Sequence, residues 1–512
     1  MKKAIILLAP ILLLSQNEAM ASKTDRRYKA SVREPARADQ FYPGDPARLE
    51  KTIDAYIKDA VPPHKEKPLA IISPHAGYIY SGQICADAFN QAAAHDYDLI
   101  VLLGTNHTSG AFRGVSIYPA GGYKTPLGIA EIDDALTAEL IDADKDFTFK
   151  ESVHVQEHSI EVMVPFVQKL FPGAKILPAV VGTPDLDLCT RFGEALAKAL
   201  RGKNALIVAS SDLSHYPEYE NAVKADKKTL DAIVKMDPEE LRSTIQKQLR
   251  EGIPNLSTCA CGQAPILAAM IAAKRLGAKG ARLISYANSG DTPIGNRSRV
   301  VGYGAVAFYD DFAEKPHPEE HRPAEPKDEF MLNRHQKKSL LSFARKTIEQ
   351  FLAAETVPLV RGFDPVLENK KGAFVTLNMH ERLRGCIGHM AEDMPLCQVV
   401  GYCATQAAFN DRRFSPVTLE ELPDIEIEIS VLTPFQEVGG VEDIQVGRDG
   451  VLIKKGDRSA VYLPSVPVEQ GWNREEMLEH LCLKAGLSRN DWKKGARFFT
   501  FQAMAFSESD LE

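Results

Sequence analysis

The sequence lacks the basic stripe with interleaved aromatic residues that nucleic-acid-binding proteins carry. Charged residues make up 25% of the 512 positions, and the formal net charge is −8. The acidic residues are spread along the chain, so an acidic interaction tail is not indicated either. We therefore expect no nucleic acid among the partners.

The sequence also lacks the dense cysteine spacing of a disulfide scaffold, which is typical of small secreted domains. Its eight cysteines are scattered through the chain, at positions 85, 189, 259, 261, 386, 397, 403 and 482. Scattered free thiols fit a reducing compartment better than an oxidising one.

The apolar run at the N-terminus is too short to span a bilayer comfortably. Two lysines precede an apolar stretch over residues 4–14, and residues 19–21 read Ala-Met-Ala, a small-residue cleavage site. This layout predicts a signal peptide over residues 1–21 and an exported protein. If Met20 is the true start, the protein is cytoplasmic instead, as its cysteines favour.

Three apolar runs in the first 300 residues each lead through a turn of small residues to a histidine. The runs cover residues 69–73, 99–103 and 206–209, and the histidines are His75, His107 and His215. Short β-branched runs are typical of buried strands in a parallel sheet, and ligands bind at the carboxyl ends of such strands. Three imidazoles at one sheet edge indicate a metal site or an acid–base site.

The chain is long enough for at least two cores. Strand and helix patterns alternate over residues 30–312, with helices expected near residues 83–94 and 158–170, and this alternation predicts an α/β domain. Residues 313–329 are charged and rich in proline, so they predict a linker. A smaller α+β domain is expected over residues 330–510.

Several sequence blocks of the first domain occur together in one known family. They are Phe41-Tyr42-Pro43, Thr125-Pro126-Leu127-Gly128, Glu157-His158-Ser159-Ile160-Glu161 and Cys261-Gly262. In this combination the domain resembles the Memo family from Val32 to about Phe308. The resemblance implies a fold similar to that of class III non-haem iron extradiol dioxygenases.

The resemblance also implies a metal site of two histidines and one cysteine. Position by position, these ligands fall on His75, His107 and Cys261, and Cys261 is preferred to Cys259 because it directly precedes a glycine. Such donors suit a single metal ion, with iron or copper favoured and zinc possible. The candidates for moving protons beside the metal are His158, Asp212, His215 and Glu161. A purely structural role is the alternative for each of these side chains.

A zinc-protease pattern also occurs in the first domain. His154-x-x-Glu157-His158 matches it, and that pattern requires two histidines one helical turn apart. A second match, His317-x-x-Glu320-His321, falls inside the predicted linker, where no such helix is credible. Because one of the two matches is accidental, the pattern alone is weak evidence for a zinc protease.

The main motif of the second domain is the block Leu-Arg-Gly-Cys-Ile-Gly over residues 383–388. Its Cys386 is either a small buried thiol in a glycine turn or a nucleophile whose thiolate Arg384 favours, with His389 or His380 as partner. With the blocks over residues 410–414 and 482–487, the motif resembles the AMMECR family. This resemblance implies a fold and little chemistry.

The sequence therefore predicts a metal-binding Memo/AMMECR fusion with iron- or copper-dependent, dioxygenase-like redox chemistry. Two other classes stay open, a non-catalytic adaptor that binds a protein or peptide and a zinc-dependent hydrolase. Proteins of both families tend to occur with a radical S-adenosylmethionine protein in prokaryotes, and the resemblance therefore implies such a partner.

Overall fold

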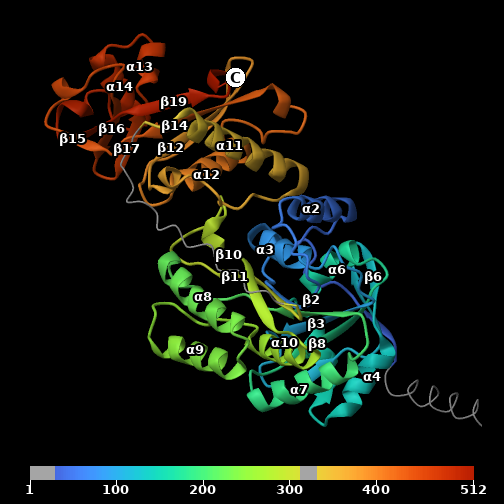
Figure 1. Cartoon of the computed structure of the whole chain (residues 1–512). Helices are drawn as coiled ribbons and strands as arrows, with labels where there is room; N and C mark the ends of the chain where they lie inside the picture. The colour runs from blue at the N-terminus through green and yellow to red at the C-terminus, as the bar shows by residue number, and fades with distance from the viewer. Residues whose placement is uncertain (1–28, 312–330, 512) are drawn as a thin grey trace, which may run out of the picture. The chain divides into compact units, whose positions relative to one another are not determined.

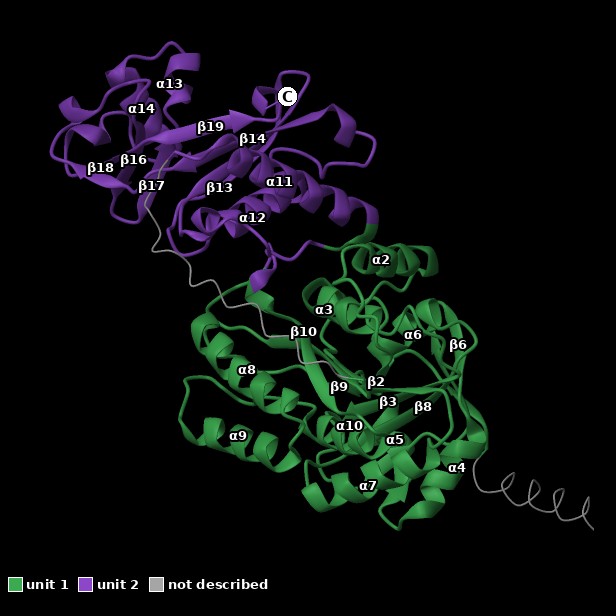
Figure 2. Ribbon diagram, viewed as in Figure 1, with its two compact units in different colours: residues 1–290, 295–315, 354–356 green, residues 291–294, 316–353, 357–512 purple. Residues whose placement is uncertain are grey.

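The computed structural model describes residues 29–311 and 331–511. The chain divides into two compact units, residues 1–290, 295–315 and 354–356 and residues 291–294, 316–353 and 357–512 (Figure 2). The predicted signal peptide and the predicted linker lie outside the described residues. Among the helices of those residues, none is both long enough and apolar enough to cross a membrane.

An eight-stranded mixed sheet forms the centre of the first unit (Figure 1). In spatial order its strands are β10 (Gly280–Asn288), β11 (Gly302–Tyr309), β2 (Pro68–Ser73), β9 (Ala205–Ser210), β3 (Leu99–Thr105), β8 (Lys175–Val181), β4 (Val115–Ile117) and β7 (Phe147–Thr148). A separate small sheet contains β1 (Ser31–Arg33), β5 (Gly121–Thr125) and β6 (Gly128–Glu131).

The predicted parallel arrangement is confirmed for the middle of the large sheet and is wrong for the strands beside it. Strands β2, β9, β3 and β8 run parallel, with Ser73 beside Ser210 and Leu103 beside Ala209. Strand β11 pairs antiparallel with β10 and β2, and β4 pairs antiparallel with β8 but parallel with β7. The carboxyl ends of β2, β9 and β3 therefore meet at one edge, and the segments that carry His75, His215 and His107 leave the sheet there.

Helices cover both faces of the large sheet (Figure 1). On one face, α3 (Tyr78–Asn90) lies against β2, β10 and β11 and is backed by α2 (Pro46–Lys58). On the other, α10 (Gln263–Leu276) packs on β2, β9 and β3 and also on α7 (Leu186–Ala199). The further helices of the unit are α4 (Asp134–Ala143), α5 (Glu151–His154), α6 (Val164–Leu170), α8 (Tyr219–Val234) and α9 (Pro238–Arg250).

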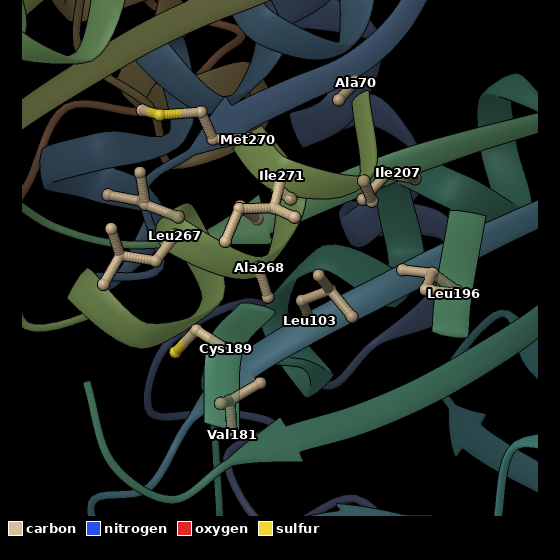
Figure 3. Close-up of a cluster of buried hydrophobic side chains, with 14 of the residues drawn as sticks. Ala70, Leu103, Val181, Cys189, Leu196, Ile207, Leu267, Ala268, Met270 and Ile271 are labelled. Atoms are coloured by element: carbon tan, nitrogen blue, oxygen red, sulfur yellow. The ribbon is translucent and has the colours of Figure 1, made fainter. Parts of the chain in front are cut away.

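The core between the sheet and α7 and α10 is built from aliphatic side chains of both layers (Figure 3). Its labelled members include Leu103, Val181 and Ile207 from the strands and Leu196, Leu267 and Ile271 from the helices. Each buried side chain of this size contributes about 1.5–3 kcal/mol relative to its exposed state. This core fixes the strand ends and the start of α10 relative to each other.

The expected helix over residues 158–170 is wrong in its first half. Residues 155–160 are not helical, a single 3₁₀ turn covers Glu161–Met163, and α6 begins only at Val164. Pro165 occupies the first turn of α6, where its missing N–H costs nothing. The helix expected near residues 83–94 is present, but it begins earlier, at Tyr78.

The second unit contains two antiparallel four-stranded sheets. The first has the order β13 (Arg382–His389), β12 (Ala373–Met379), β14 (Ile425–Leu432) and β19 (Ala503–Ser507), and α11 (Arg334–Ala354) and α12 (Leu396–Phe409) share its core. The second has the order β15 (Gln436–Val438), β18 (Arg497–Phe501), β16 (Gly450–Lys455) and β17 (Arg458–Tyr462). Helix α14 (Arg474–Lys484) packs on this second sheet, and α13 (Ser465–Glu469) precedes it.

Candidate metal centre

Three side chains from distant parts of the first unit meet at the edge of the large sheet. One ligand atom from each of His75, His107 and Cys261 lies within 4.8 Å of the others. Within this group, His75 Nε2 and Cys261 Sγ are 3.2 Å apart. The structure thus brings together the three residues that the Memo resemblance implied as metal ligands.

His75 is held from both its backbone and its ring. Its backbone N–H donates to Asp212 Oδ1 at 2.8 Å, and its Nδ1 lies 2.7 Å from Ser210 Oγ. The Ser210 hydroxyl donates its own hydrogen to the carbonyl oxygen of Ser159, so it accepts from Nδ1. Because Nδ1 carries the proton, the lone pair of His75 lies on Nε2, the atom beside Cys261.

His107 is fixed by one carboxylate. Glu157 Oε1 is 2.9 Å from the Nδ1 atom of His107, and Oε2 accepts the backbone N–H of His107 at 2.7 Å. Burial alone raises the pKa of Glu157, but the hydrogen bond and charge of His107 and the charge of His158 outweigh it and lower the pKa to about 2. An ionised carboxylate only accepts hydrogen bonds, so Nδ1 of His107 donates and Nε2 keeps its lone pair.

Cys261 reaches the centre because the chain before α10 passes very close to the end of β9. The Cys261 N–H donates to the backbone oxygen of Asp212, and the Gly262 N–H donates to Ser211 Oγ at 2.9 Å. A Cβ atom at Gly262 would lie 2.1 Å from the backbone oxygen of Ser210. The glycine that follows Cys261 is therefore required by packing, which explains the Cys-Gly pair in the sequence.

Burial affects the titration of two of the three candidate ligands, His75 and Cys261. Burial, with the charge of His107 acting in the same direction, lowers the pKa of His75 well below its usual range. Burial likewise raises the pKa of the Cys261 thiol, and the charge of Asp212 adds to this effect. Metal binding requires neutral imidazoles and a thiolate, and a bound cation supplies the charge that favours the thiolate.

His158 and His215 lie around the three candidate ligands. The His158 ring stacks on His107, with ring centroids 4.6 Å apart, and on Phe41 at 4.9 Å. His215 places a ring nitrogen in a second group of converging ligand atoms, with Asp212 and Cys261. Its Nε2 atom is buried and has no hydrogen-bond partner. Both histidines thus lie at the centre, as the sequence analysis expects.

Glu161 does not join this group. Its carboxylate forms a buried ion pair with Arg33, at 2.8 Å, and accepts hydrogen bonds from the Tyr42 hydroxyl and the N–H groups of Ala36 and Arg37. These partners occupy both oxygens of Glu161. Glu161 therefore has a structural role in place of the expected role in proton movement. Its carboxylate binds the segment over residues 33–42 to the rest of the unit.

The zinc-protease pattern is contradicted by the local structure. His154 ends α5, and residues 155–160 are not helical, so His154 and His158 do not share a helical face. Both ring nitrogens of His154 are already bonded, Nδ1 to the Tyr123 hydroxyl at 2.8 Å and Nε2 to Ser116 Oγ at 2.9 Å. His154 is a buried structural residue.

Comparison with known proteins assigns the family. A family model described as Memo-like protein matches residues 33–307, and a second model, AMMECR1, matches residues 341–506. The first match covers more than half of the chain.

The chain belongs to the Memo family. A MEMO1 family protein of Nitrosopumilus maritimus is 35% identical over 283 residues, which is 54% of this chain and 99% of that protein. A MEMO1 family protein of Aquifex aeolicus is 38% identical over 281 residues, again 54% of this chain and 99% of that protein. A solved structure of an uncharacterised protein from Pyrococcus horikoshii is 37% identical, with a TM-score of 0.34, over 35% of this chain and 93% of that one.

The Memo domain uses residues that sequence reasoning did not assign to the site. Glu157 and Ser210 orient the two imidazoles, and Arg33 donates to the backbone oxygens of His154 and Glu157. In the sequence, the one signal that could have assigned Glu157 to the site is its position directly before His158 in a family block. Cys259, to which Cys261 was preferred as a ligand, is fully buried in the core.

In the AMMECR domain, Arg384 does not act on Cys386. Its guanidinium bonds both oxygens of Glu421 and the backbone oxygens of Ser415 and Pro416. The proposed histidine partners bind elsewhere, since His389 pairs with Asp393 at 2.6 Å and His380 lies 3.9 Å from Asp424. Burial raises the pKa of the Cys386 thiol and the charge of Arg413 acts in the opposite direction. Arg413 also donates to the Cys386 backbone oxygen.

Proposed function

We propose that the Memo domain binds one redox-capable metal ion, iron or copper, through His75, His107 and Cys261, and uses it for oxidation chemistry. The observation that carries the proposal is the orientation of the two imidazoles. Each ring gives its Nδ1 proton to a neighbouring oxygen, Ser210 Oγ or Glu157 Oε1, and keeps an Nε2 lone pair. Metal-binding histidines in proteins are oriented in this way.

The donor set supports a transition metal and fits a single ion. Two imidazole nitrogens and one thiolate sulfur are borderline-soft ligands, which suit iron, copper and zinc and do not suit magnesium or calcium. Two ligands of one tetrahedral ion are about 3.5 Å apart, and His75 Nε2 lies 3.2 Å from Cys261 Sγ. When bound, iron or copper supplies one-electron redox chemistry that no protein side chain of this site offers.

The side chains around the metal would admit a substrate, orient the ligands and move protons. His107 is 30% exposed on its side chain whereas His75 is 1% exposed, so the centre is open to a small substrate on the His107 side. His158 is half-buried beside His107, and burial lowers its pKa to about 3, so its imidazole is neutral there. Asp212 holds the backbone of His75 and lies beside its ring.

A zinc-dependent hydrolase is a second candidate because the same three donors bind zinc and leave a fourth position open. A non-catalytic adaptor is favoured by no particular contact of the described residues. Export of the protein and a radical S-adenosylmethionine partner stay predictions.

Elemental analysis of the purified full chain tests the proposal. The variants are His107→Ala, which removes one proposed ligand, and His335→Ala, an exposed residue of α11, as the matched control. We expect about one iron or copper per chain in the wild type and in the control, and little in His107→Ala. Full metal content in His107→Ala would refute the ligand assignment, and zinc as the sole metal would reject redox chemistry in favour of hydrolysis.

A further inference from the structure

Arg33 places a buried guanidinium beside the segment that leads to His158. Its side chain is 2% exposed, and each of its five N–H groups has an acceptor. One acceptor is the carboxylate of Glu161, and the other four are backbone carbonyl oxygens. The ion pair with Glu161 therefore uses one donor, and most of the side chain binds the backbone.

Three of the four carbonyl groups belong to the end of α5 and the turn that follows it. The Nε–H group of Arg33 donates to the His154 oxygen at 2.8 Å. The Nη2 group donates to the oxygens of Val155, at 3.3 Å, and Glu157, at 2.7 Å. Residues 155–160 are not helical, so these oxygens are not bonded in the pattern of a continuing helix. The planar guanidinium binds them instead and fixes the course of the turn.

The peptide unit between Glu157 and His158 is held from two sides. Its C=O group accepts from Arg33 Nη2 at 2.7 Å, and its N–H group donates to Glu157 Oε1 at 2.9 Å. Among the described residues every peptide bond is trans, and in a trans unit the C=O and N–H bonds point in opposite directions. By holding the oxygen, Arg33 therefore directs the N–H group of the same unit toward the Glu157 carboxylate.

The carboxylate that accepts this N–H group is the one that holds His107. Its Oε1 atom also lies 2.9 Å from His107 Nδ1, and Oε2 accepts the His107 backbone N–H at 2.7 Å. Because the Glu157 side chain is 1% exposed, bulk water cannot replace a donor that moves away. A turn of the 157–158 peptide unit therefore changes the hold on the ring of a candidate metal ligand.

The ion pair with Glu161 does not explain why an arginine occupies this position. Replacing a buried ion pair by apolar side chains of similar volume is often neutral or stabilising. A lysine would supply the same charge, but its ammonium has three donors and lacks the planar arrangement of a guanidinium. The feature that only arginine supplies is the set of donors that binds three carbonyl groups and a carboxylate together.

We propose that Arg33 is a positioning residue for the candidate metal centre. It acts through the 157–158 peptide unit and the Glu157 carboxylate on the ring of His107. Its effect on metal affinity rests on the proposed function, whereas its effect on the hold of His107 exists in the metal-free chain. Loss of the guanidinium should therefore loosen His107 first and weaken metal binding as a consequence.

Three variants of the full chain separate the backbone bonds of Arg33 from its charge. Arg33→Lys keeps a cation beside Glu161 and loses the planar set of donors. Glu161→Gln keeps the guanidinium and loses the ion pair, so it is the matched control. The double variant Arg33→Met with Glu161→Gln removes both charges and leaves no uncompensated buried charge, which protects it from unfolding.

Hydrogen exchange of the metal-free chain, resolved to the His107 amide by mass spectrometry, measures the hold on this residue. We expect its exchange rate to rise about tenfold in Arg33→Lys and in the double variant, and to change less than about twofold in Glu161→Gln. The amides of residues 99–103 in β3 report global unfolding in the same experiment. Loss of the ion pair alone should accelerate these core amides and leave His107 unaffected.

Titration with Co²⁺, followed by visible absorption, measures the affinity of the centre. We expect the Kd to rise by about 10–100-fold in Arg33→Lys and in the double variant and to stay unchanged in Glu161→Gln. If the wild type binds no Co²⁺, that result counts against the proposed metal centre, and the exchange rates alone decide the role of Arg33. Unchanged exchange at His107 in Arg33→Lys, or an equal rise in Glu161→Gln, would overturn the proposal.

Discussion

Glu157 holds both the ring and the backbone of His107, with Oε1 2.9 Å from Nδ1 and Oε2 2.7 Å from the backbone nitrogen. The same Oε1 atom accepts the N–H groups of His158 and Ser159 at 2.9 Å. One buried carboxylate therefore fixes the rotation of a candidate ligand and the loop that carries its stacking partner. Such orienting groups typically change metal affinity by 10–100-fold when they are replaced.

The substitution Glu157→Gln should weaken metal binding without removing a ligand. Gln keeps one acceptor oxygen, but its NH₂ group faces either the His107 Nδ1–H or the His107 backbone N–H, where a donor meets a donor. We expect the affinity for the bound metal to fall by about 10–100-fold and stability to fall by about 1–3 kcal/mol. Competition with a chelator of known affinity measures the first effect, and urea denaturation measures the second.

The control for this prediction is Gln156→Glu, at the exposed neighbouring position. That variant should bind the metal as the wild type does. An unchanged affinity in Glu157→Gln would show that the His107 ring is held by other contacts.

The substitution Glu161→Gln should separate stability from metal binding. Arg33 and Glu161 are an ion pair of almost completely buried side chains, 2% and 1% exposed. Loss of one partner leaves an uncompensated buried charge, which costs about 3–5 kcal/mol. We expect a fall of this size in the free energy of unfolding, measured by urea denaturation, and an unchanged metal content in the folded protein. Loss of metal from a variant that remains fully folded would restore Glu161 as a site residue.

The positions of the two candidate histidine ligands could be predicted from the sequence because they depend on local pattern. The runs before His75 and His107 are β-branched and bounded by small residues, and the structure has β2 and β3 there. Parallel strands carry their loops to one edge, so the convergence followed from the strand type alone. The strands β4, β10 and β11 are antiparallel because of connections that no local pattern encodes.

The residues that orient the ligands could not be predicted, since their roles depend on contacts between distant segments. Ser210 bonds a ring that is 135 positions away, and Glu157 bonds one that is 50 positions away. Arg384 illustrates the opposite error. It is close to Cys386 in the sequence, but its side chain binds Glu421 and does not contact the thiol. The pairing of β12 with β13 shifts its register at this point of the strand.

The substitution Gly262→Ala should disturb the approach of Cys261 to the centre. The added methyl group would lie 2.1 Å from the Ser210 oxygen and 2.5 Å from Ser211 Cβ, so the start of α10 must move away from β9. We expect a loss of about 1–3 kcal/mol in stability from overpacking, together with reduced metal content. Gly110→Ala, where a Cβ meets open space, is the control and should change neither quantity. Normal metal content in Gly262→Ala would mean that the close approach at Gly262 is not needed to place the Cys261 sulfur.

A buried carboxyl that is not a candidate ligand makes the stability of the Memo domain depend on pH. Asp226 accepts hydrogen bonds from the N–H and hydroxyl of Ser214 and from the Tyr286 hydroxyl at 2.9 Å. Burial nevertheless dominates and raises its pKa from 3.8 to about 7. Between these two pH values the folded protein binds a proton that the unfolded chain has lost. The stability contributed by this proton is complete below pH 3.8 and is lost as pH rises through about 7.

The substitution Asp226→Asn should remove this slope. Between pH 5 and 8 the free energy of unfolding of the wild type should fall by about 2–3 kcal/mol more than that of the variant. All other titrating groups are common to both proteins, so the difference between their two curves isolates Asp226. Asp231→Asn, an exposed change on the same helix, should keep the wild-type slope. Parallel curves for the wild type and Asp226→Asn, obtained by urea denaturation at each pH, would show that the carboxyl stays ionised in the folded domain.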